Sequence, residues 1–356
     1  MFKTRGYAVH NAQSPLVPFT FDRRDVGAND VRIEILYTGI CHSDLHQAHN
    51  DWSNSLYPMV PGHEIVGRVV EVGSEVSNFK VGDHAGVGCM VDSCRHCSSC
   101  KANLEQYCEE GGPTVTYNGT ERGTTDKLTF GGYSEQIVVE KRFVVKIAPN
   151  LDLKAVAPLL CAGITTYSPL RHWKVGPSQK VGVVGLGGLG HMGVKFAKAM
   201  GAEVVMITTS PAKGADAKRL GADSVLVSTD ADAMLAQANT FDFVLNTVPV
   251  SHDVNPYMAL LKLDKTMCLV GVLTALDPPA MGFSMIAGRK SLAGSAIGGM
   301  AETQEMLDFC AEKGIVSDVE MVDIQGVNAA WERLPKNDVK YRFVIDMASL
   351  RNQAAA

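Results

Sequence analysis

The sequence lacks the features that mark several whole classes of protein. Its apolar stretches, such as KVGVVGLGGLG, are short and broken by glycines, so no segment has the roughly 20 apolar residues that span a bilayer. The first residues, MFKTRGYAVHNAQSPLVPF, hold no continuous apolar stretch of the kind a secretory signal uses. The net charge of −5 gives no basic footprint for nucleic acid. We therefore expect a cytoplasmic protein with neither membrane nor nucleic-acid partners.

The nine cysteines do not form a disulfide scaffold, which would be short, secreted and rich in cysteine throughout. Clustered reduced thiols indicate metal binding instead. Four cysteines follow the spacing C-x2-C-x2-C-x7-C, which can bring all four to one tetrahedral ion and leaves no open position. We interpret them as a structural zinc site, because no second cluster supports the rival iron–sulfur interpretation. The four are Cys94, Cys97, Cys100 and Cys108.

Three other cysteines lie within apolar stretches. Cys89 is part of GVGCMV, while Cys268 and Cys310 fall in strand-like and helix-like patterns. Thiols in such surroundings usually behave as small buried hydrophobes. We expect all three to be core residues without a metal-binding role.

The 356 residues allow two domains, and the texture of the sequence changes along them. To about residue 150 the chain reads as β-rich, with VRIEILYTG, EIVGRVVEVG and YSEQIVVEKRFVVKI as strand candidates. Near-continuous apolar strands then alternate with helices, which predicts a parallel sheet covered on both faces. The final VKYRFVIDM resembles the first region again. We therefore predict an α/β protein in which a β-rich domain, 1–158 and 299–356, receives an inserted domain, 159–298.

The inserted domain is predicted to hold six strands and five helices. The strand candidates are KVGVVGLGG, EVVMITTS, DSVLVST, FDFVLNTV, KTMCLVGV and SLAGSAIG. The helices between these strands are expected over residues 191–201, 211–222, 230–240, 255–263 and 281–289.

A glycine-rich loop joins the first of these strands to the first helix. Such a loop, placed between strand and helix, is typical of dinucleotide binding. Gly185 makes the tight turn, Gly187 admits a pyrophosphate to the backbone, and Gly190 lets the helix pack closely on the strand. The loop consists of Gly185, Leu186, Gly187, Gly188, Leu189 and Gly190.

The next strand candidate lacks the acid that an NAD site usually places about 20 residues after the loop. EVVMITTSPAK ends instead in Thr208, Thr209 and Ser210, with Lys213 three residues later. Hydroxyl groups and an ammonium group can bind a 2′-phosphate, which a carboxylate would repel. The pattern therefore favours NADP(H) over NAD(H).

A second set of metal-ligand residues is dispersed over three segments. Cys41 lies in GICHSDLH, His63 and Glu64 lie in VPGHEIVG, and Cys161 lies in APLLCAGITT. Each alone could be a buried cysteine or a satisfied core histidine. Two thiolates and a neutral imidazole around Zn²⁺ carry no net charge, against −2 for four thiolates, so this centre can act as a Lewis acid through an open position.

These motifs together resemble the zinc-containing alcohol dehydrogenases of the medium-chain family. The resemblance is to the cinnamyl-type, NADP-dependent branch with its bacterial aldehyde reductases, and it covers essentially the whole chain. It rests on GICHSDLH, the GHE motif, the four-cysteine lobe, GLGGLG and DVKYRFVID. The resemblance implies a GroES-like catalytic domain, a Rossmann domain, two zinc ions per subunit and usually a homodimer.

The resemblance also implies roles at the catalytic centre. Cys41, His63 and Cys161 match the catalytic zinc ligands, and Glu64 matches a carboxylate that replaces water on the metal during exchange. Asp44 matches an acid that orients a ligand imidazole.

Four further positions match residues that act on substrate and cofactor. Ser43 and His46 match a proton relay, in which the hydroxyl passes a proton that His46 exchanges with solvent. Thr165 and Leu189 match positions that pack against the nicotinamide. The implied reaction is NADPH-dependent reduction of an aldehyde to a primary alcohol, with the reverse oxidation also catalysed.

The sequence departs from the plant lignin enzymes where their substrate pocket is lined. Val115 and Ala296 stand where those enzymes carry bulky aromatic residues, and Trp52 is a candidate for a remaining wall. Loss of two stacking surfaces favours a wider pocket for aliphatic and aromatic aldehydes.

Two other classes of function remain as alternatives. A zinc-free quinone or enoyl reductase would keep the glycine loop but lack the dispersed ligands, and a zinc-stabilised NADPH-binding protein would leave those ligands unexplained. Counting metal separates them, since the dehydrogenase needs two zinc ions per chain and either rival needs one.

Overall fold

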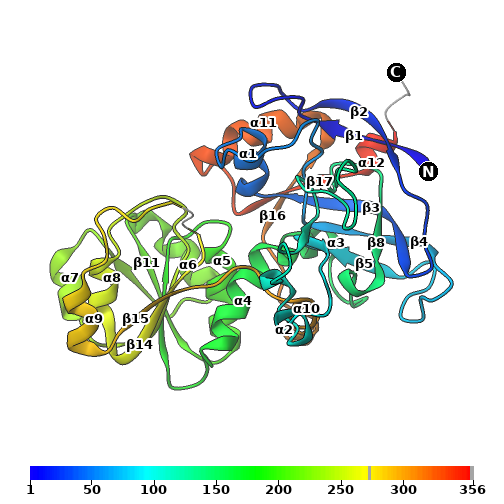
Figure 1. The fold of residues 1–356 in the computed structure, drawn as a ribbon. Helices are drawn as coiled ribbons and strands as arrows, with labels where there is room; N and C mark the ends of the chain where they lie inside the picture. Colours follow the sequence, from blue (N-terminus) through cyan, green and yellow to red (C-terminus); the bar gives the residue numbers. More distant parts are fainter. Residues whose placement is uncertain (272–273, 353–356) are drawn as a thin grey trace. The chain divides into compact units, whose positions relative to one another are not determined.

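The computed structural model describes residues 1–271 and 274–352. The chain forms two compact units, and the first combines Met1–Cys161 with the segment that begins at Gly298. The second unit is Ala162–Ile297, drawn green to orange in Figure 1. The chain therefore leaves the first unit once and later returns to it. The sequence places the same two crossings at 158/159 and 298/299.

A seven-stranded sheet forms the framework of the first unit. Its strands are β3 (Asp30–Ile40), β4 (Ile65–Val72), β5 (His84–Val87), β8 (Gln136–Glu140), β9 (Val145–Lys146), β16 (Val319–Asp323) and β17 (Arg342–Asp346). The order is β16-β17-β3-β4-β5-β9, with β8 also paired to β3. In β3 the fully buried Val31, Ile33 and Ile35 alternate with polar residues, as a strand with one face in the core requires. This sheet joins the last strand of the chain to the first third of it.

Shorter elements complete the first unit. Two ribbons pair β1 (Phe2–Ala8) with β2 (Val17–Arg23) and β6 (Met90–Asp92) with β7 (Thr114–Val115). The helices are α1 (His42–Ala48), α2 (Ser98–Lys101), α3 (Leu153–Val156), α10 (Met300–Lys313), α11 (Val327–Arg333) and α12 (Ala348–Arg351). The 3-10 turns are η1 (Glu105–Tyr107), η2 (Lys141–Phe143), η3 (Ala157–Leu160), η5 (Ile324–Gly326) and η6 (Leu334–Lys336).

The second unit is built on a six-stranded sheet in which every pair is parallel. Its strands are β10 (Lys180–Val184), β11 (Glu203–Thr208), β12 (Ser224–Val227), β13 (Phe241–Asn246), β14 (Leu261–Leu269) and β15 (Ser291–Gly294). The order β12-β11-β10-β13-β14-β15 is that of the doubly wound dinucleotide-binding fold. All six strand candidates of the sequence are strands here.

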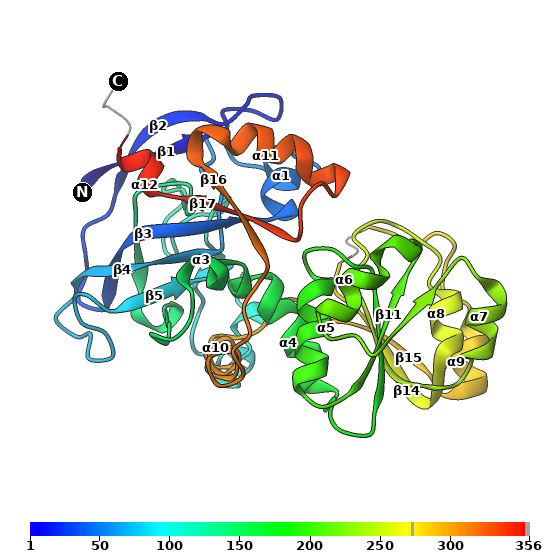
Figure 2. The ribbon, with the colours of Figure 1, turned by 180° about the vertical axis from the view of Figure 1, so that it is seen from behind.

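Helices cover both faces of this parallel sheet (Figure 2). They are α4 (Ala162–His172), α5 (Gly190–Ala199), α6 (Gly214–Arg219), α7 (Ala231–Ala236), α8 (Asn255–Leu260) and α9 (Gly282–Gly288), with the 3-10 turn η4 (Pro211–Lys213) before α6. The side chains of α7, α8 and α9 join one core with the sheet, and α4 packs with α5. The predicted α/β architecture with a doubly wound sheet is confirmed.

Three predicted helices were too long. Those expected over 211–222 and 230–240 end at Arg219 and Ala236. The sequence suggests a helix over 255–263, but α8 ends at Leu260 and β14 already begins at Leu261. Leu261 is fully buried and pairs with Phe241 ahead of a bulge. The apolar periodicity of this segment fits a helix as well as a strand, and the pairing with β13 makes Leu261 part of the sheet.

No helix within the described ranges has the length and apolar character needed to cross a membrane.

Candidate active site

The three dispersed ligand segments meet inside the first unit. Cys41 follows β3 and precedes α1, His63 and Glu64 lie just before β4, and Cys161 follows η3. Since β3 and β4 pair in antiparallel fashion, the end of one strand lies beside the start of the other, and the Gly39 amide donates to the Glu64 carbonyl at 2.9 Å. The sheet pairing thus places the first two segments together.

Their ligand atoms fit one metal ion. One atom each from Cys41, His63, Glu64 and Cys161 lies within 4.8 Å of all the others. The sulfurs of Cys41 and Cys161 are 4.0 Å apart, and zinc–sulfur bonds of about 2.3 Å at a tetrahedral angle separate two sulfurs by about 3.8 Å. All four residues are at least nine-tenths buried. Four buried donors converging in this way suit Zn²⁺.

Asp44 fixes the orientation of the candidate histidine ligand. Its fully buried carboxylate lies 3.0 Å from Nδ1 of His63 and accepts hydrogen bonds from the amides of Cys41 and Gly62 at 2.9 and 3.1 Å. Burial disfavours the charged imidazole, but the Asp44 carboxylate together with the neighbouring thiols outweighs burial and raises the pKa of His63 well above its usual value. With Nδ1 engaged, Nε2 of His63 is left to face the metal position.

The two candidate relay residues lie on α1, close to the ligands. The Ser43 oxygen is 3.7 Å from the Cys41 sulfur. His46 follows Ser43 by three residues, a spacing that puts both on one side of a helix. Its Nδ1 lies 2.7 Å from a carboxylate oxygen of Asp51, and both side chains are partly exposed. The structure therefore gives the implied relay an inner hydroxyl and an outer imidazole.

The four-cysteine lobe is a second, local donor set in the same unit. Its sulfurs all lie within 4.8 Å of one another, and those of Cys94 and Cys100 are 3.8 Å apart. Backbone amides of Glu109 and Cys100 donate to the Cys97 sulfur and lower the pKa of its thiol to about 6. Burial raises the pKa of Cys100 to about 12. A bound cation is what lets all four sulfurs ionise together, so the donor set fits structural zinc.

The glycine loop has the backbone that a phosphate cradle requires. Gly185 has φ +90°, a left-handed conformation that strongly favours glycine. A side chain on Gly187 would meet nothing within 4 Å, whereas one on Gly190 would collide with the Gly185 carbonyl. The loop is thus open at Gly187 and tightly packed at Gly190, where α5 begins.

The residues predicted to read the 2′-phosphate lie beside this loop. The Gly185 amide donates to the Ile207 carbonyl at 3.0 Å, which holds the end of β11 against the loop. Lys213 donates to the Leu186 carbonyl at 3.2 Å, so its ammonium reaches the loop itself. Thr208 is buried, and its hydroxyl oxygen accepts from the Ser210 amide at 3.2 Å. Thr209 is exposed at the same strand end.

The remaining predicted residues divide between the units. Thr165 on α4 is buried, and Leu189 precedes α5. Trp52 packs its ring against His46 with centroids 5.9 Å apart, and Val115 on β7 is 38% exposed. Ala296 is exposed and belongs to the second unit. The wider substrate pocket that these residues suggest stays a prediction.

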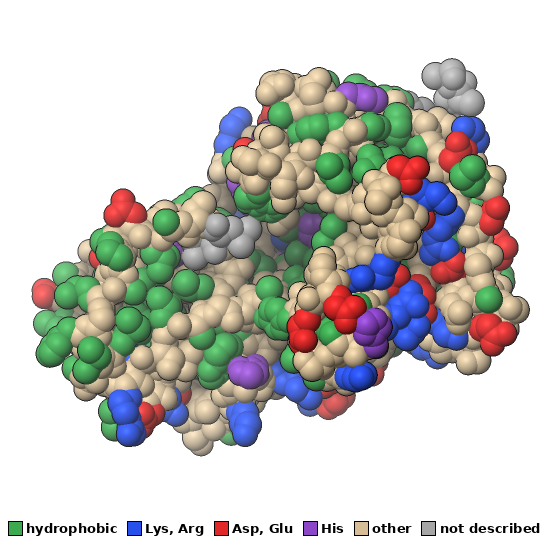
Figure 3. Space-filling view, viewed as in Figure 1, with side chains coloured by type: hydrophobic (Ala, Val, Ile, Leu, Met, Phe, Trp, Pro, Cys, Tyr) green, Lys and Arg blue, Asp and Glu red, His purple; other side chains and the backbone are tan. Residues whose placement is uncertain are grey.

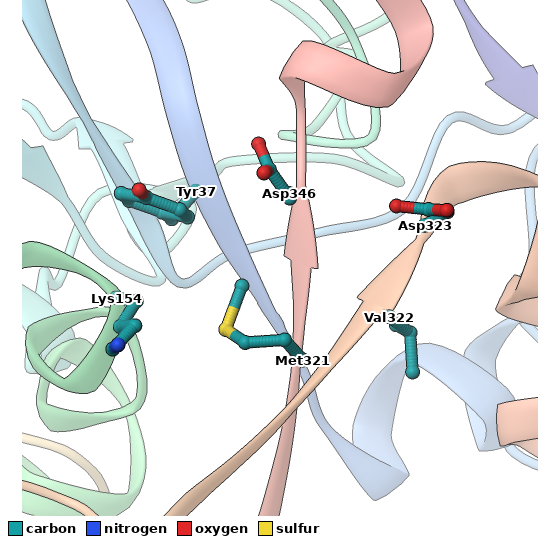
Figure 4. A pocket seen from close by; sticks show the side chains of 6 residues that line it. All are labelled: Tyr37, Lys154, Met321, Val322, Asp323 and Asp346. Carbon is teal, nitrogen blue, oxygen red and sulfur yellow. The ribbon is translucent and has the colours of Figure 1, made fainter.

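A hollow of about 370 Å³ lies elsewhere in the first unit. Figure 4 shows Tyr37, Met321 and Asp346 facing it across the surface of β3, β16 and β17. None of the sequence-predicted site residues lines it, so this hollow is not the active site.

Two family models match the chain. The one described as the alcohol dehydrogenase GroES-like domain matches residues 27–149, and the one described as zinc-binding dehydrogenase matches residues 188–312. Aldehyde reductase YahK of Escherichia coli is 55% identical over 351 residues, which cover 98% of this chain and 99% of that protein. The chain belongs to the zinc-binding alcohol dehydrogenases.

Solved structures of alcohol dehydrogenases share the fold. The structure of a cinnamyl alcohol dehydrogenase of Sorghum bicolor, SbCAD4, matches with a TM-score of 0.92 and 47% sequence identity. The match covers 98% of each chain. The cinnamyl alcohol dehydrogenase of Helicobacter pylori, solved with NADP(H), has a TM-score of 0.89 and 40% identity over 97% of this chain and 98% of that one. The predicted family and enzyme class are confirmed, and the predicted zinc and NADP(H) agree with these descriptions.

The dehydrogenase also contains a buried ion pair that was not predicted from the sequence. Arg342 on β17 donates to a carboxylate oxygen of Glu64, and both side chains are at least 95% buried. Burial raises the pKa of Glu64 to about 7 in spite of the arginine. The other carboxylate oxygen of Glu64 has no hydrogen-bond partner among the described residues. Arg342 stands in the DVKYRFVID motif, which is the signal that could have found it.

Cys89 departs in part from the predicted packed core thiol. Its side chain is only half-buried, and its sulfur lies 3.9 Å from the carbonyl oxygen of Leu160, the residue before Cys161. The apolar pattern GVGCMV indicates burial but not which side chain lies opposite. Cys268 and Cys310 are fully buried, as expected.

Proposed function

We propose that this dehydrogenase reduces aldehydes, aliphatic as well as aromatic, to primary alcohols with NADPH, and that the reaction is reversible. The observation that carries the proposal is the convergence of Cys41, His63 and Cys161 in one buried set. Three far-separated ligands leave a fourth position for an oxygen, which a structural site does not need. When bound there, zinc acts as a Lewis acid on a carbonyl oxygen, and NADPH supplies the hydride.

The chain's own residues position these groups and move the proton. Asp44 holds His63 in one orientation, and Arg342 balances the buried charge of Glu64. Ser43, beside Cys41, gives a proton to the product oxygen, and His46 restores it from solvent. Asp51 holds the outer imidazole through Nδ1. The same groups take up the proton when an alcohol is oxidised.

The preference for NADPH is supported by the end of β11. Lys213 lies against the glycine loop, and Ser210 stands near it on the chain. A carboxylate that would accept hydrogen bonds from an NAD ribose is lacking from the stretch Thr208–Lys213.

A broad substrate range is supported by the two positions where aromatic residues are lacking. Val115 and Ala296 present small side chains, and Val115 is 38% exposed. Small side chains leave room for chains and rings of different shape.

The proposal is tested by assaying a panel of aldehydes and alcohols with NADPH, NADH and their oxidised forms. We expect NADPH to support reduction of hexanal and cinnamaldehyde, with two zinc ions per chain. Cys161→Ala should abolish turnover and keep NADPH binding, because its position is in the metal set and not in the glycine loop. One zinc per chain in fully active protein, or undiminished activity of Cys161→Ala, would refute the zinc role.

A paired variant tests the choice of cofactor. Replacing Ser210 and Lys213 together by alanine should weaken NADPH binding by about 10- to 100-fold, the effect of losing charge-assisted hydrogen bonds. NADH binding, measured in the same titration, serves as the control and should change little. Unchanged NADPH affinity would contradict the assignment.

We also infer a homodimer formed at one edge of the second unit. Among the described residues, β15 pairs only with β14, so its other side is free. Helix α9, which precedes β15, leaves Phe283 and Ile286 77% and 79% exposed. Figure 3 shows hydrophobic side chains gathered over the part of this unit that carries α7, α8 and α9. A free strand edge beside exposed apolar side chains suits a second copy related by a two-fold axis.

A reducing compartment, the cytoplasm, suits these sites. None of the nine cysteines is in a disulfide, and six of them belong to the two metal sets. Oxidation of those thiols would compete with metal binding.

A further inference from the structure

Tyr117 lies against the catalytic ligand set, and nothing in the sequence motifs assigns it a role. It follows β7 by two residues and is only 7% exposed. Its ring stacks on that of His63, with centroids 5.8 Å apart and planes at 25°. Burial and the Asp44 carboxylate together raise the pKa of the Tyr117 hydroxyl, so these two groups interact. One tyrosine thus touches both a metal ligand and the carboxylate that orients this ligand.

The surrounding backbone holds Tyr117 on both sides. The amide of the preceding Thr116 donates to the Cys89 carbonyl at 3.2 Å. The side chain of the following Asn118 accepts from the Leu56 amide at 2.7 Å. The Tyr117 ring is therefore held against the imidazole of His63. A neighbour in a fixed position can in turn restrict the plane of this imidazole.

Asp44 depends on such donors because it is a fully buried charge. Its carboxylate receives two backbone amides and the His63 ring, and it receives the hydroxyl of Tyr133 at 3.3 Å. Tyr117, whose ring covers the imidazole, adds a hydroxyl that interacts with the same carboxylate. A buried carboxylate with well-placed donors keeps one orientation, and it transmits that orientation to the histidine.

We propose that Tyr117 is a positioning residue of the catalytic metal centre, because it clamps the ring of His63 and the carboxylate of Asp44 together. The aromatic face sets the plane of the imidazole, and the hydroxyl sets the carboxylate that holds Nδ1. Together these contacts aim Nε2 at the metal position. The inference rests on the proposed function, since it takes these ligands to hold zinc.

Two variants separate the contacts. Tyr117→Phe keeps the ring and removes the hydroxyl, whereas Tyr117→Leu removes both. Tyr133→Phe removes a hydroxyl from the same carboxylate but leaves the stacking on His63 intact. Tyr257→Leu, at a half-buried tyrosine of α8 in the second unit, is the control.

The first readout is the rate at which zinc-loaded enzyme releases its catalytic zinc to a chelating dye. Loss of a residue behind a ligand typically costs 10- to 100-fold in metal affinity or activity, so we expect Tyr117→Leu to release zinc about 10- to 100-fold faster. Tyr117→Phe should fall between Tyr117→Leu and wild type, and Tyr257→Leu should match wild type. The second zinc, in the four-cysteine lobe, should leave every variant at the same rate.

The second readout is the visible absorption of enzyme carrying cobalt in the catalytic site. Tyr117→Leu should shift the ligand-field bands, because the imidazole is no longer held in one plane, and Tyr117→Phe should restore most of the wild-type spectrum. A packing role alone would lower thermal stability without moving the bands. Wild-type bands and wild-type zinc release in Tyr117→Leu would overturn the proposal; if that variant does not fold, the same result in Tyr117→Phe would overturn the part assigned to the hydroxyl.

These readouts do not require any substrate. Should the protein retain zinc as described but fail to reduce aldehydes, the proposed function fails and the role of Tyr117 stands. Should it reduce aldehydes while Tyr117 leaves the metal unaffected, only the role of Tyr117 fails.

Discussion

The buried ion pair of Glu64 and Arg342 is expected to have a large effect on the free energy of unfolding. Both are buried, and Gly39 on β3 leaves the space that the carboxylate fills, since a side chain there would collide with it. Removing one member of a buried ion pair leaves the other charge without compensation, and this usually costs more than removing both.

We therefore predict that Arg342→Gln lowers the free energy of unfolding by about 3–5 kcal/mol. Chemical denaturation of the zinc-loaded enzyme measures the change. The double variant Glu64→Gln with Arg342→Gln should recover a large part of the loss, because it no longer buries an isolated charge. Equal stability of the single and double variants would show that the two side chains do not compensate each other.

At the scale of single residues, the sequence predicted ligands better than the groups behind them. Cys41, His63 and Cys161 carry recognisable motifs, and the structure brings them together. Arg342 lies 278 residues from its partner Glu64, and the pairing of β17 with β3 and of β3 with β4 joins these regions. No local pattern predicts a contact of that range.

At the scale of elements, the side chain of Asp242 links three neighbouring strands of the parallel sheet in the second unit. This residue of β13 lies 2.8 Å from the Lys262 ammonium of β14 and accepts from the Lys180 amide of β10 at 3.0 Å. Burial alone would raise its pKa, but the hydrogen bonds and the charges of Lys262 and Lys265 outweigh burial and lower it below the usual 3.8. Three neighbouring strands therefore share one carboxylate.

The stabilisation by Asp242 is expected to decrease at acidic pH. Because the folded state binds the Asp242 proton more weakly than the unfolded state, this residue's contribution is complete above pH about 5 and is lost as the pH falls through the lowered pKa. We predict that Asp242→Asn destabilises the enzyme by about 1–3 kcal/mol at pH 7. The difference from wild type should shrink steadily below pH about 4.

Unfolding midpoints at several pH values measure this difference. Asp126→Asn, at an exposed aspartate, is the control and should follow wild type throughout. A gap between Asp242→Asn and wild type that stays constant down to the acid limit would contradict the prediction.

Most elements of the second unit were predictable because its strands are continuous apolar runs and most of its helices are amphipathic. Helix α4 (Ala162–His172) was not among the five predicted helices. The six strands and the glycine loop follow from these local patterns. The end of α8 does not, since Leu260 and Leu261 are both fully buried and only the pairing of Leu261 with Phe241 assigns it to a strand. Tertiary pairing decided the boundary that periodicity left open.

At the scale of the whole molecule, the edge at β15 makes a prediction about assembly. Replacing Phe283 and Ile286 together by glutamate puts charges of one sign where two copies would meet. We expect the variant to sediment as a monomer at micromolar concentration, whereas wild type sediments as a dimer. Val81→Glu, at a 62% exposed valine of the first unit, should behave as wild type. A monomeric wild type would refute the homodimer, and a dimer that survives both glutamates would place its interface elsewhere.

The division of the chain into an interrupted unit and an inserted one has a consequence for biosynthesis. A ribosome that has completed Glu64 must add 278 more residues before Arg342 exists. At about 5–20 residues per second this takes roughly 14 to 55 seconds. During that interval the whole inserted unit can emerge and fold, while the nascent catalytic half still waits for its final strand. A polypeptide whose translation stops early would therefore carry a finished nucleotide-binding half beside an acid that has not yet met its cation.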